Sequence, residues 1–258
     1  MTKTHETTEE LYKAPALDKG LDIIELLSST DEGLSQAEIA KALDRSPNEI
    51  YRMLDRLVRR YYVVRTSEDR YELSLKLFGL AHRHPPMRRL VSLALPAMRR
   101  FTRKAEQACH MVVYDRGSGV VIAQTDAPGY WGLSIRVGSH ISLLNTGSGH
   151  VLLAFVTETE RKLMLDERVP IPGETSPERF EQIIAKVRQR GYEVRPSQQT
   201  AGVTNISVPI LSSTGIPLAA LTCPHIRRLD RDDAPLRDDI LAMLLTTAGE
   251  ISAAAGVA

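Results

Sequence analysis

The sequence has few cysteines, few aromatic residues and no long apolar run. Its 258 residues include only two cysteines, Cys109 and Cys223, which are far apart and form no C-x-x-C motif. This argues against a disulfide framework and a thiolate zinc site, so we expect two buried thiols and no metal. The best apolar runs, residues 91–98 and 240–245, are far shorter than the roughly 18 residues that a membrane helix needs. We therefore expect no membrane partner.

A targeting signal and an excess of charge are also missing. Residues 1–10 are acidic and hold no apolar core, which favours a cytoplasmic location. The 33 Lys and Arg against 32 Asp and Glu leave a net charge of +1, unlike a protein that coats nucleic acid. Any contact with nucleic acid must therefore be local. Residues 45–70, with seven arginines against four acidic residues, are the place to look for it.

Length and composition indicate two ordinary globular domains, and the first domain begins with helical signals. The chain is 43% hydrophobic, and 258 residues exceed one typical domain of about 150. After a polar tail (residues 1–14), which we expect to be disordered, apolar residues recur every three or four positions over 17–29. Ser35 and Glu38 then fit a capping box, so a second helix is predicted to begin at Gln36.

The next segment repeats the helix-start signature and continues into a hairpin pattern. Ser46 and Glu49 form a second capping pair, which predicts a third helix over residues 47–60. Two β-prone runs follow, at 61–64 and 70–73, with turn-forming residues between them. Three helices followed by a hairpin are typical of a winged helix-turn-helix.

We therefore predict a winged helix-turn-helix domain over residues 15–73 that binds double-stranded DNA. The third helix buries an apolar stripe around Ile50 and Leu54, which leaves Asn48 and Arg52 on the opposite face. Arginine and asparagine are the side chains that read guanine and adenine in the major groove. The candidate DNA contacts are Ser35, Gln36, Ser46, Asn48, Tyr51, Arg52, Arg56, Arg65 and Arg70.

Each DNA contact has a simpler alternative. Asn48 and Arg52 fit an ordinary solvated helix face, and Arg65 and Arg70 fit a hairpin that is merely kept soluble. The capped helices, the polar stripe and the wing together favour the DNA interpretation for the helix.

The rest of the chain reads as a linker helix and an α+β domain. Residues 74–86 predict the linker helix, which ends at a His-Pro-Pro sequence, and residues 87–258 form the second domain. A helical pattern resumes over 87–108, where Pro96 should introduce a kink or a new start. Strands are predicted at 111–114, 120–124, 133–137, 192–195, 203–211 and 218–223, and helices at 150–155, 158–166, 176–190 and 236–251. An antiparallel sheet with grouped helices is large enough to hold a ligand pocket.

The order of several short segments resembles the isocitrate lyase regulator (IclR) family of bacterial transcription factors over nearly the whole chain. The segments are Leu17–Ile24, Gly33–Ala40, Ile50–Leu54, Tyr71–Ser74, Arg136–Gly138, Thr146–Gly149 and Arg190–Tyr192. The resemblance implies a GAF-like effector domain that binds a small metabolite. It also implies a homodimer or a dimer of dimers on a palindromic operator, control of a catabolic operon, and no cofactor.

The resemblance also implies an effector site, in which this chain departs from the family pattern. His150 stands where the family has a lysine, Arg195 where it often has an acid, and Asn205 where it often has a cysteine. The resemblance places Gly147, Ser148, Arg195, Asn205 and Thr222 in the pocket. Thr146 before them and the adjacent aromatic residues Tyr130 and Trp131 are further candidates for effector contacts. A guanidinium beside a helix start favours an anionic ligand, so we expect a small carboxylate effector.

Other interpretations remain open for single residues and for the whole chain. Tyr130 and Trp131 fit an interface or core packing as well as a pocket wall, and His110 fits a satisfied core histidine. A metabolic enzyme is one alternative function, but the sequence shows no catalytic residues, since no nucleophile–base pair or metal cluster is visible. A protein-interaction module that uses the winged helix for oligomerisation is another.

Overall fold

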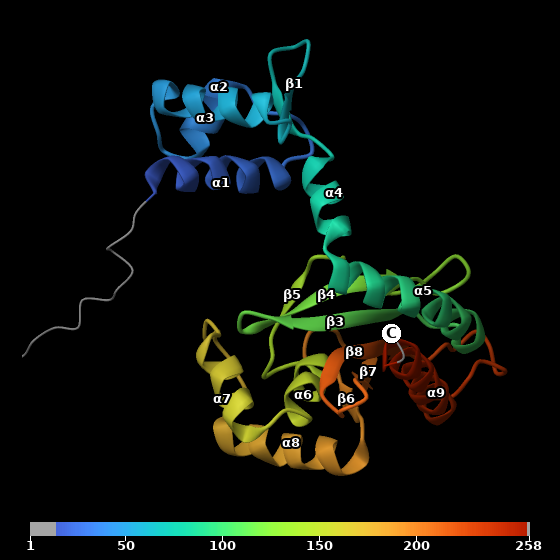
Figure 1. Ribbon diagram of the computed structural model, residues 1–258. Coiled ribbons are helices and arrows are strands. Elements are labelled where there is room, and N and C mark those ends of the chain that lie inside the picture. The colour runs from blue at the N-terminus through green and yellow to red at the C-terminus, as the bar shows by residue number, and fades with distance from the viewer. Residues whose placement is uncertain (1–13, 257–258) are drawn as a thin grey trace, which may run out of the picture. The chain divides into compact units, whose positions relative to one another are not determined.

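The computed structural model describes residues 14–256, and the chain divides into two compact units, Met1–Pro85 and Pro86–Ala258 (Figure 1). The tail expected to be disordered, residues 1–14, lies almost entirely outside the described residues. Each unit has its own apolar core. No helix in the described part of the chain is long and apolar enough to cross a membrane.

The first unit is a winged helix-turn-helix, as predicted. Its elements are α1 (Pro15–Ser28), α2 (Gln36–Ala42), α3 (Pro47–Arg59), β1 (Val63–Arg65), β2 (Tyr71–Leu73) and α4 (Lys76–Arg83). Each of the first three helices contributes a fully buried isoleucine to one shared core, namely Ile23, Ile39 and Ile50. The two strands are antiparallel, and Leu34 bridges to Tyr71, which joins the wing to the start of α2.

Both predicted capping boxes are confirmed. The Glu38 carboxylate accepts a hydrogen bond from the Ser35 amide (2.7 Å), and the Glu49 carboxylate accepts one from the Ser46 amide (3.1 Å). Lys19 on α1 also donates to Glu49 (2.7 Å) and ties the first helix to the start of the third. Lys19 and Ser46 together lower the pKa of Glu49 to about 2.

The second unit is a six-stranded antiparallel sheet between two groups of helices. The strand order is β5-β4-β3-β8-β7-β6. The strands are β3 (Cys109–Asp115), β4 (Ser118–Thr125), β5 (His140–Ile141), β6 (Glu193–Pro196), β7 (Val203–Leu211) and β8 (Pro217–Ile226). The helices are α5 (Pro85–Ala105), α6 (Gly147–Ala154), α7 (Glu158–Asp166), α8 (Pro177–Arg190) and α9 (Arg237–Gly256). Helices α5 and α9 pack on one face, and α6 and α8 belong to the core on the other face (Figure 1).

Three details differ from the sequence-based expectation or refine it. Residues 133–137 form no strand, because the chain turns at Gly138 (φ +89°) and pairs with β4 only from there onward. Helix α6 begins at Gly147 rather than at His150, so the glycines lie in its first turn. Helix α5 continues through Pro96, where both Pro96 and Ser92, whose carbonyl loses its donor, are exposed to solvent.

Strand register places five polar side chains in one row across the sheet. Each is paired with the next in the order Gln124, His110, Thr222, Ser207 and Glu193. Directly opposite residues in an antiparallel sheet share a face, and here it is the face that carries α6. Polar groups in such a buried position need partners, and the first turn of α6 supplies some of them.

The first turn of α6 fits onto the sheet only because it contains glycine. A Cβ added to Gly147 would lie 2.6 Å from Ser207 Oγ, and one added to Gly149 would lie closer than 3.0 Å to backbone atoms of Leu143. The Ser207 side chain has some freedom to shift, but the Leu143 backbone has little. Gly149 therefore sets the position of α6.

We predict that Gly149→Ala destabilises the second unit by about 1–3 kcal/mol or more, because the methyl group has no room beside the Leu143 backbone. Gly249→Ala in α9 is the matched control. Its added Cβ meets no atom within 4 Å, so it should stabilise the unit by up to about 1 kcal/mol. Urea unfolding of both variants measures the difference, and equal stabilities would contradict this account of α6.

Candidate DNA interface and effector pocket

The exposed face of α3 carries the side chains that were expected to read DNA. Asn48, Tyr51, Arg52 and Arg56 are all exposed, with Tyr51 at 55%, whereas Ile50 and Leu54 on the opposite face are buried. Within residues 14–256, the side chains of Arg52 and Arg56 form no hydrogen bond or ion pair. Their guanidinium groups are therefore available to bases or phosphates.

Other arginines near this face are engaged within the domain. Arg59 forms an ion pair with Asp55 one turn away (2.9 Å). In the wing, Arg65 pairs with Asp69 and lies over the Tyr71 ring at 5.8 Å. Arg65 thus differs from Arg52, since a phosphate contact by Arg65 must compete with Asp69 and the Tyr71 ring.

Arg70 is held more firmly than Arg65. Its guanidinium pairs with Glu38 (3.0 Å) and donates to the Gly33 carbonyl, so it joins the wing to α2. This pairing supports the position of the wing, and a DNA contact by Arg70 stays a prediction.

The three polar residues at the helix starts also have structural partners. Ser35 and Ser46 take part in the capping boxes, and Gln36 Nε2 donates to the Pro47 carbonyl (2.9 Å). The Gln36 bond spans the turn between α2 and α3 and fixes the two helices relative to each other. DNA contacts by Ser35, Gln36 and Ser46 remain predictions.

The sheet face that carries α6 contains a cavity of about 230 Å³. Five of the expected effector contacts line it, namely Thr146, Gly147, Ser148, Asn205 and Thr222. The remaining lining residues are His110, Leu133, Ile135, Ser139, His140, Ile141, Ser197, Gln199, Thr200, Val203 and Pro224. No Lys, Arg, Asp or Glu side chain is among these residues.

Hydrogen bonds fix the inner wall of this cavity. Thr146 Oγ1 caps α6 by accepting from the Gly149 amide (3.1 Å). Ser148 Oγ lies 2.7 Å from Thr222 Oγ1, which donates to Ser207 Oγ (2.8 Å), so a chain of hydroxyl groups joins α6 to the sheet. Among the described residues, the amides of Gly147 and Ser148 have no hydrogen-bond acceptor. Such first-turn N–H groups suit an anionic oxygen.

Arg195 does not line this cavity, contrary to expectation. Its Nη1 lies 3.1 Å from His150 Nδ1 and 3.7 Å from a Glu193 carboxylate oxygen. Glu193 and Arg195 are separated by one residue on β6, so their side chains share a face of the sheet. The Glu193 carboxylate contacts both the Arg195 guanidinium and the buried His150 imidazole and holds them side by side. The expected cation is therefore already paired.

Tyr130 and Trp131 do not line the cavity either. They are 89% and 54% exposed, on a loop that follows β4. The loop takes part in no strand pairing, and an effector contact by either aromatic residue stays a prediction.

His110 is a site residue that sequence reasoning missed. It is only 6% exposed and lines the cavity, and its Nδ1 is buried without a hydrogen-bond partner in the described part of the chain. It is therefore not a satisfied core histidine. Burial lowers the pKa of His110 to about 4, so its imidazole is neutral near pH 7. Alternation along the strand could have placed His110 on the same face as Val112. That it lies beside Thr222 could not be predicted, because this depends on the pairing of β3 with β8, which are far apart in the chain.

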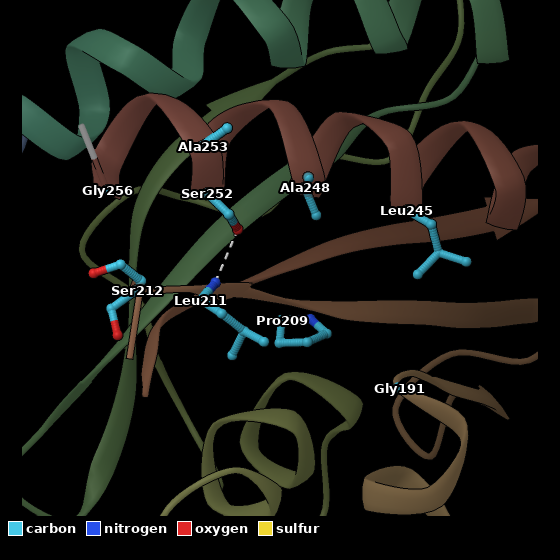
Figure 2. A pocket seen from close by; sticks show the side chains of 11 residues that line it. Gly191, Pro209, Leu211, Ser212, Leu245, Ala248, Ser252, Ala253 and Gly256 are labelled. Atoms are coloured by element: carbon cyan, nitrogen blue, oxygen red, sulfur yellow. Dashed lines mark hydrogen bonds between the residues drawn. The ribbon is translucent and has the colours of Figure 1, made fainter. Parts of the chain in front are cut away.

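A larger hollow, of about 580 Å³, lies between α9 and the end of β7 (Figure 2). It is lined by small and apolar residues, including Ala248, Ala253 and Pro209, and Ser252 Oγ accepts from the Leu211 amide (2.9 Å). Its lining contains no charged side chain and no buried polar atom without a partner in the residues described. It lacks the polar groups that orient a small polar ligand.

Comparison with known proteins identifies the chain. Two family models match it, IclR helix-turn-helix domain over residues 16–67 and bacterial transcriptional regulator IclR C-terminal over residues 87–253. The chain belongs to the IclR family. It is accordingly a transcriptional regulator with a DNA-binding helix-turn-helix and a C-terminal effector domain, and not an enzyme.

The similarity to relatives and to solved structures extends over most of this chain. It is 29% identical to the HTH-type transcriptional regulator KdgR of Escherichia coli over 226 residues (85% of this chain and 84% of that protein). It is 26% identical to the Pca regulon regulatory protein of Pseudomonas putida (92% and 82%). An IclR homologue from Microbacterium hydrocarbonoxydans, solved in complex with 4-hydroxybenzoate, superposes with a TM-score of 0.78 at 22% identity (94% and 100%). The Thermotoga maritima IclR gives 0.74 at 25% (93% and 98%).

We predict that acid destabilises the effector domain through His110. The unfolded imidazole titrates near 6.5, whereas the folded one titrates near 4. The stabilisation is therefore complete above about pH 6.5 and is lost as the pH falls toward 4, by about 3 kcal/mol in total. His110→Gln should remove most of this loss, as measured by urea unfolding at about pH 7.5 and pH 4.5. An unchanged acid sensitivity would contradict the prediction.

Proposed function

We propose that this regulator binds a palindromic operator of a catabolic operon through α3 and responds to a small organic acid bound in the cavity beside α6. The observation that carries the ligand assignment is the first turn of α6. Gly147 and Ser148 line a cavity whose lining includes no acidic side chain, and their amides have no acceptor among the described residues. Backbone donors of this kind favour a carboxylate without the need for Arg195.

The names of relatives support an organic acid without identifying it. The Pseudomonas putida relative is a regulator of the Pca regulon, and the Microbacterium structure holds 4-hydroxybenzoate, an aromatic carboxylate. The cavity of this chain has both apolar walls, at Leu133 and Ile135, and the polar α6 end. Such a division suits a ligand with one carboxylate and a compact body.

A homodimer would present two α3 helices to the two halves of the operator. Apolar side chains are exposed on the first unit at Leu17 and Leu21 of α1 and at Leu75 and Leu80 next to or on α4. Exposed apolar side chains favour burial against a partner, and we assign these to a contact with a second copy, in a dimer or a dimer of dimers. Such a protein would act in the cytoplasm, where its operator lies.

Effector binding would act by changing how the two DNA-binding units are presented. The segment between the effector domain and the wing is α4, which begins right after β2. A coupling free energy of about 1–3 kcal/mol between effector and operator is sufficient for regulation.

We predict that Arg52→Ala weakens operator binding by about 1–3 kcal/mol and relaxes base preference, because it removes an exposed guanidinium from the recognition face. Arg103→Ala is the matched control, since Arg103 is an exposed arginine near the end of α5. Electrophoretic mobility shifts with the operator and with scrambled DNA measure both. An unchanged footprint for Arg52→Ala would show that the helix does not dock as proposed.

We predict that small carboxylates raise the melting temperature of the protein and that their methyl esters do not, because an ester lacks the charge that the α6 amides favour. Thermal-shift titration with benzoate, 4-hydroxybenzoate and pyruvate, each beside its ester, measures this. Asn205→Ala should reduce the shift, whereas Arg195→Ala should reduce it less, since only Asn205 lines the cavity. Equal stabilisation by acids and esters would rule out the carboxylate assignment.

A further inference from the structure

A buried carboxylate in this cavity would lack a charged partner. The lining has no Lys or Arg, and its titratable side chains are His110 and His140. An ionised group that is moved out of water is costly unless it is paired and hydrogen-bonded. Hydrogen bonds from the backbone amides of α6 would offset part of this free-energy cost, and a positive charge on one of the histidines would offset more of it.

The two histidines differ in their ability to supply that charge. His140 is exposed, and its Nδ1 lies 2.8 Å from Ser118 Oγ. His110 sits in the middle of the sheet, opposite Gln124 on β4 and Thr222 on β8, and its imidazole Nδ1 is buried without a hydrogen-bond partner among the described residues. A buried imidazole without a partner is costly for the folded protein, and a ligand that supplies an acceptor would remove that cost.

Charged groups on the elements around His110 are few and are mostly engaged. Asp126, just after β4, accepts from Gln124 Nε2 (3.1 Å). On β6 and α6, Glu193, His150 and Arg195 hold one another. The remaining titratable groups on the neighbouring strands are the buried thiols Cys109 and Cys223, exposed His140 on β5, half-buried His225 at the end of β8, and Tyr114 and Asp115 at the far end of β3. Burial alone accounts for the low pKa of His110.

We propose that His110 takes up one proton when a carboxylate enters the cavity, so that the site binds the anion and the proton together. The inference rests on the proposed carboxylate effector. The proton comes from solvent and adds to the free ring nitrogen, and the carboxylate stays ionised. No covalent bond to carbon forms or breaks, and nothing is oxidised.

The physical cause is a change of environment at the imidazole. In the empty site burial disfavours the imidazolium, whereas a carboxylate within a few ångströms favours it. Binding therefore raises the pKa of His110 toward or above neutrality. Effector affinity should then fall by up to about tenfold for each pH unit between the pKa of the free site, about 4, and the pKa of the complex, and should level off above the latter.

Calorimetry in two buffers of different ionisation enthalpy measures this uptake directly. We would titrate the full-length protein at about pH 6 with benzoate, 4-hydroxybenzoate and pyruvate. We expect an uptake close to one proton per site for the wild type and close to zero for His110→Gln. The matched control His140→Gln should keep the wild-type uptake, because His140 is exposed and already has a partner.

Each outcome decides the question. Binding without proton uptake overturns the role of His110 and leaves the carboxylate effector intact. Uptake that persists in His110→Gln also overturns it, since the ligand then carries the proton. If no carboxylate binds to the wild type, the proposed effector class fails and this inference fails with it. Should His110→Gln not fold, ¹⁵N chemical shifts of the wild-type imidazole report directly whether the ring becomes doubly protonated in the complex.

Discussion

The close approach of the first turn of α6 to β7 is the constraint on which the effector site depends. A Cβ at Gly147 would require the Ser207 side chain to shift, and one at Gly149 would collide with the backbone of Leu143. The hydroxyl groups of Ser148, Thr222 and Ser207 then hydrogen-bond in sequence, which joins helix and sheet. The helix start is thereby held above the polar row of the sheet, and Thr146, Gly147 and Ser148 line the cavity.

Charge is distributed differently in the two units. In the DNA-binding unit, Asp55, Asp69 and Glu38 each pair with an arginine, while Arg52 and Arg56 stay available on the exposed face of α3. In the effector unit Glu193, Arg195 and His150 hold one another outside the cavity lining, which contains no Lys, Arg, Asp or Glu. A neutral, preformed site can respond to an incoming charge, because no resident ion pair has to be broken first.

The N-terminal unit could be predicted from sequence more closely than the effector site. Its signals are local, as the capping pair Ser35 and Glu38 shows, so helix starts could be placed at single residues. The effector site depends on strand register, which links residues far apart in the chain. His110 lies beside Thr222 only because β3 pairs with β8, and Arg195 has an ion-pair partner in Glu193, two residues away on the same face. Residues 133–137 were expected to form a strand but form none.

The most direct measurement is a map of backbone and side-chain amide resonances of the full-length protein during titration with 4-hydroxybenzoate. The account predicts that the largest chemical-shift changes fall on the amides of Gly147 and Ser148 and on the side-chain amide of Asn205. Changes concentrated instead around Gly249 and Ser252, in the hollow beside α9, would contradict the placement of the effector beneath the start of α6.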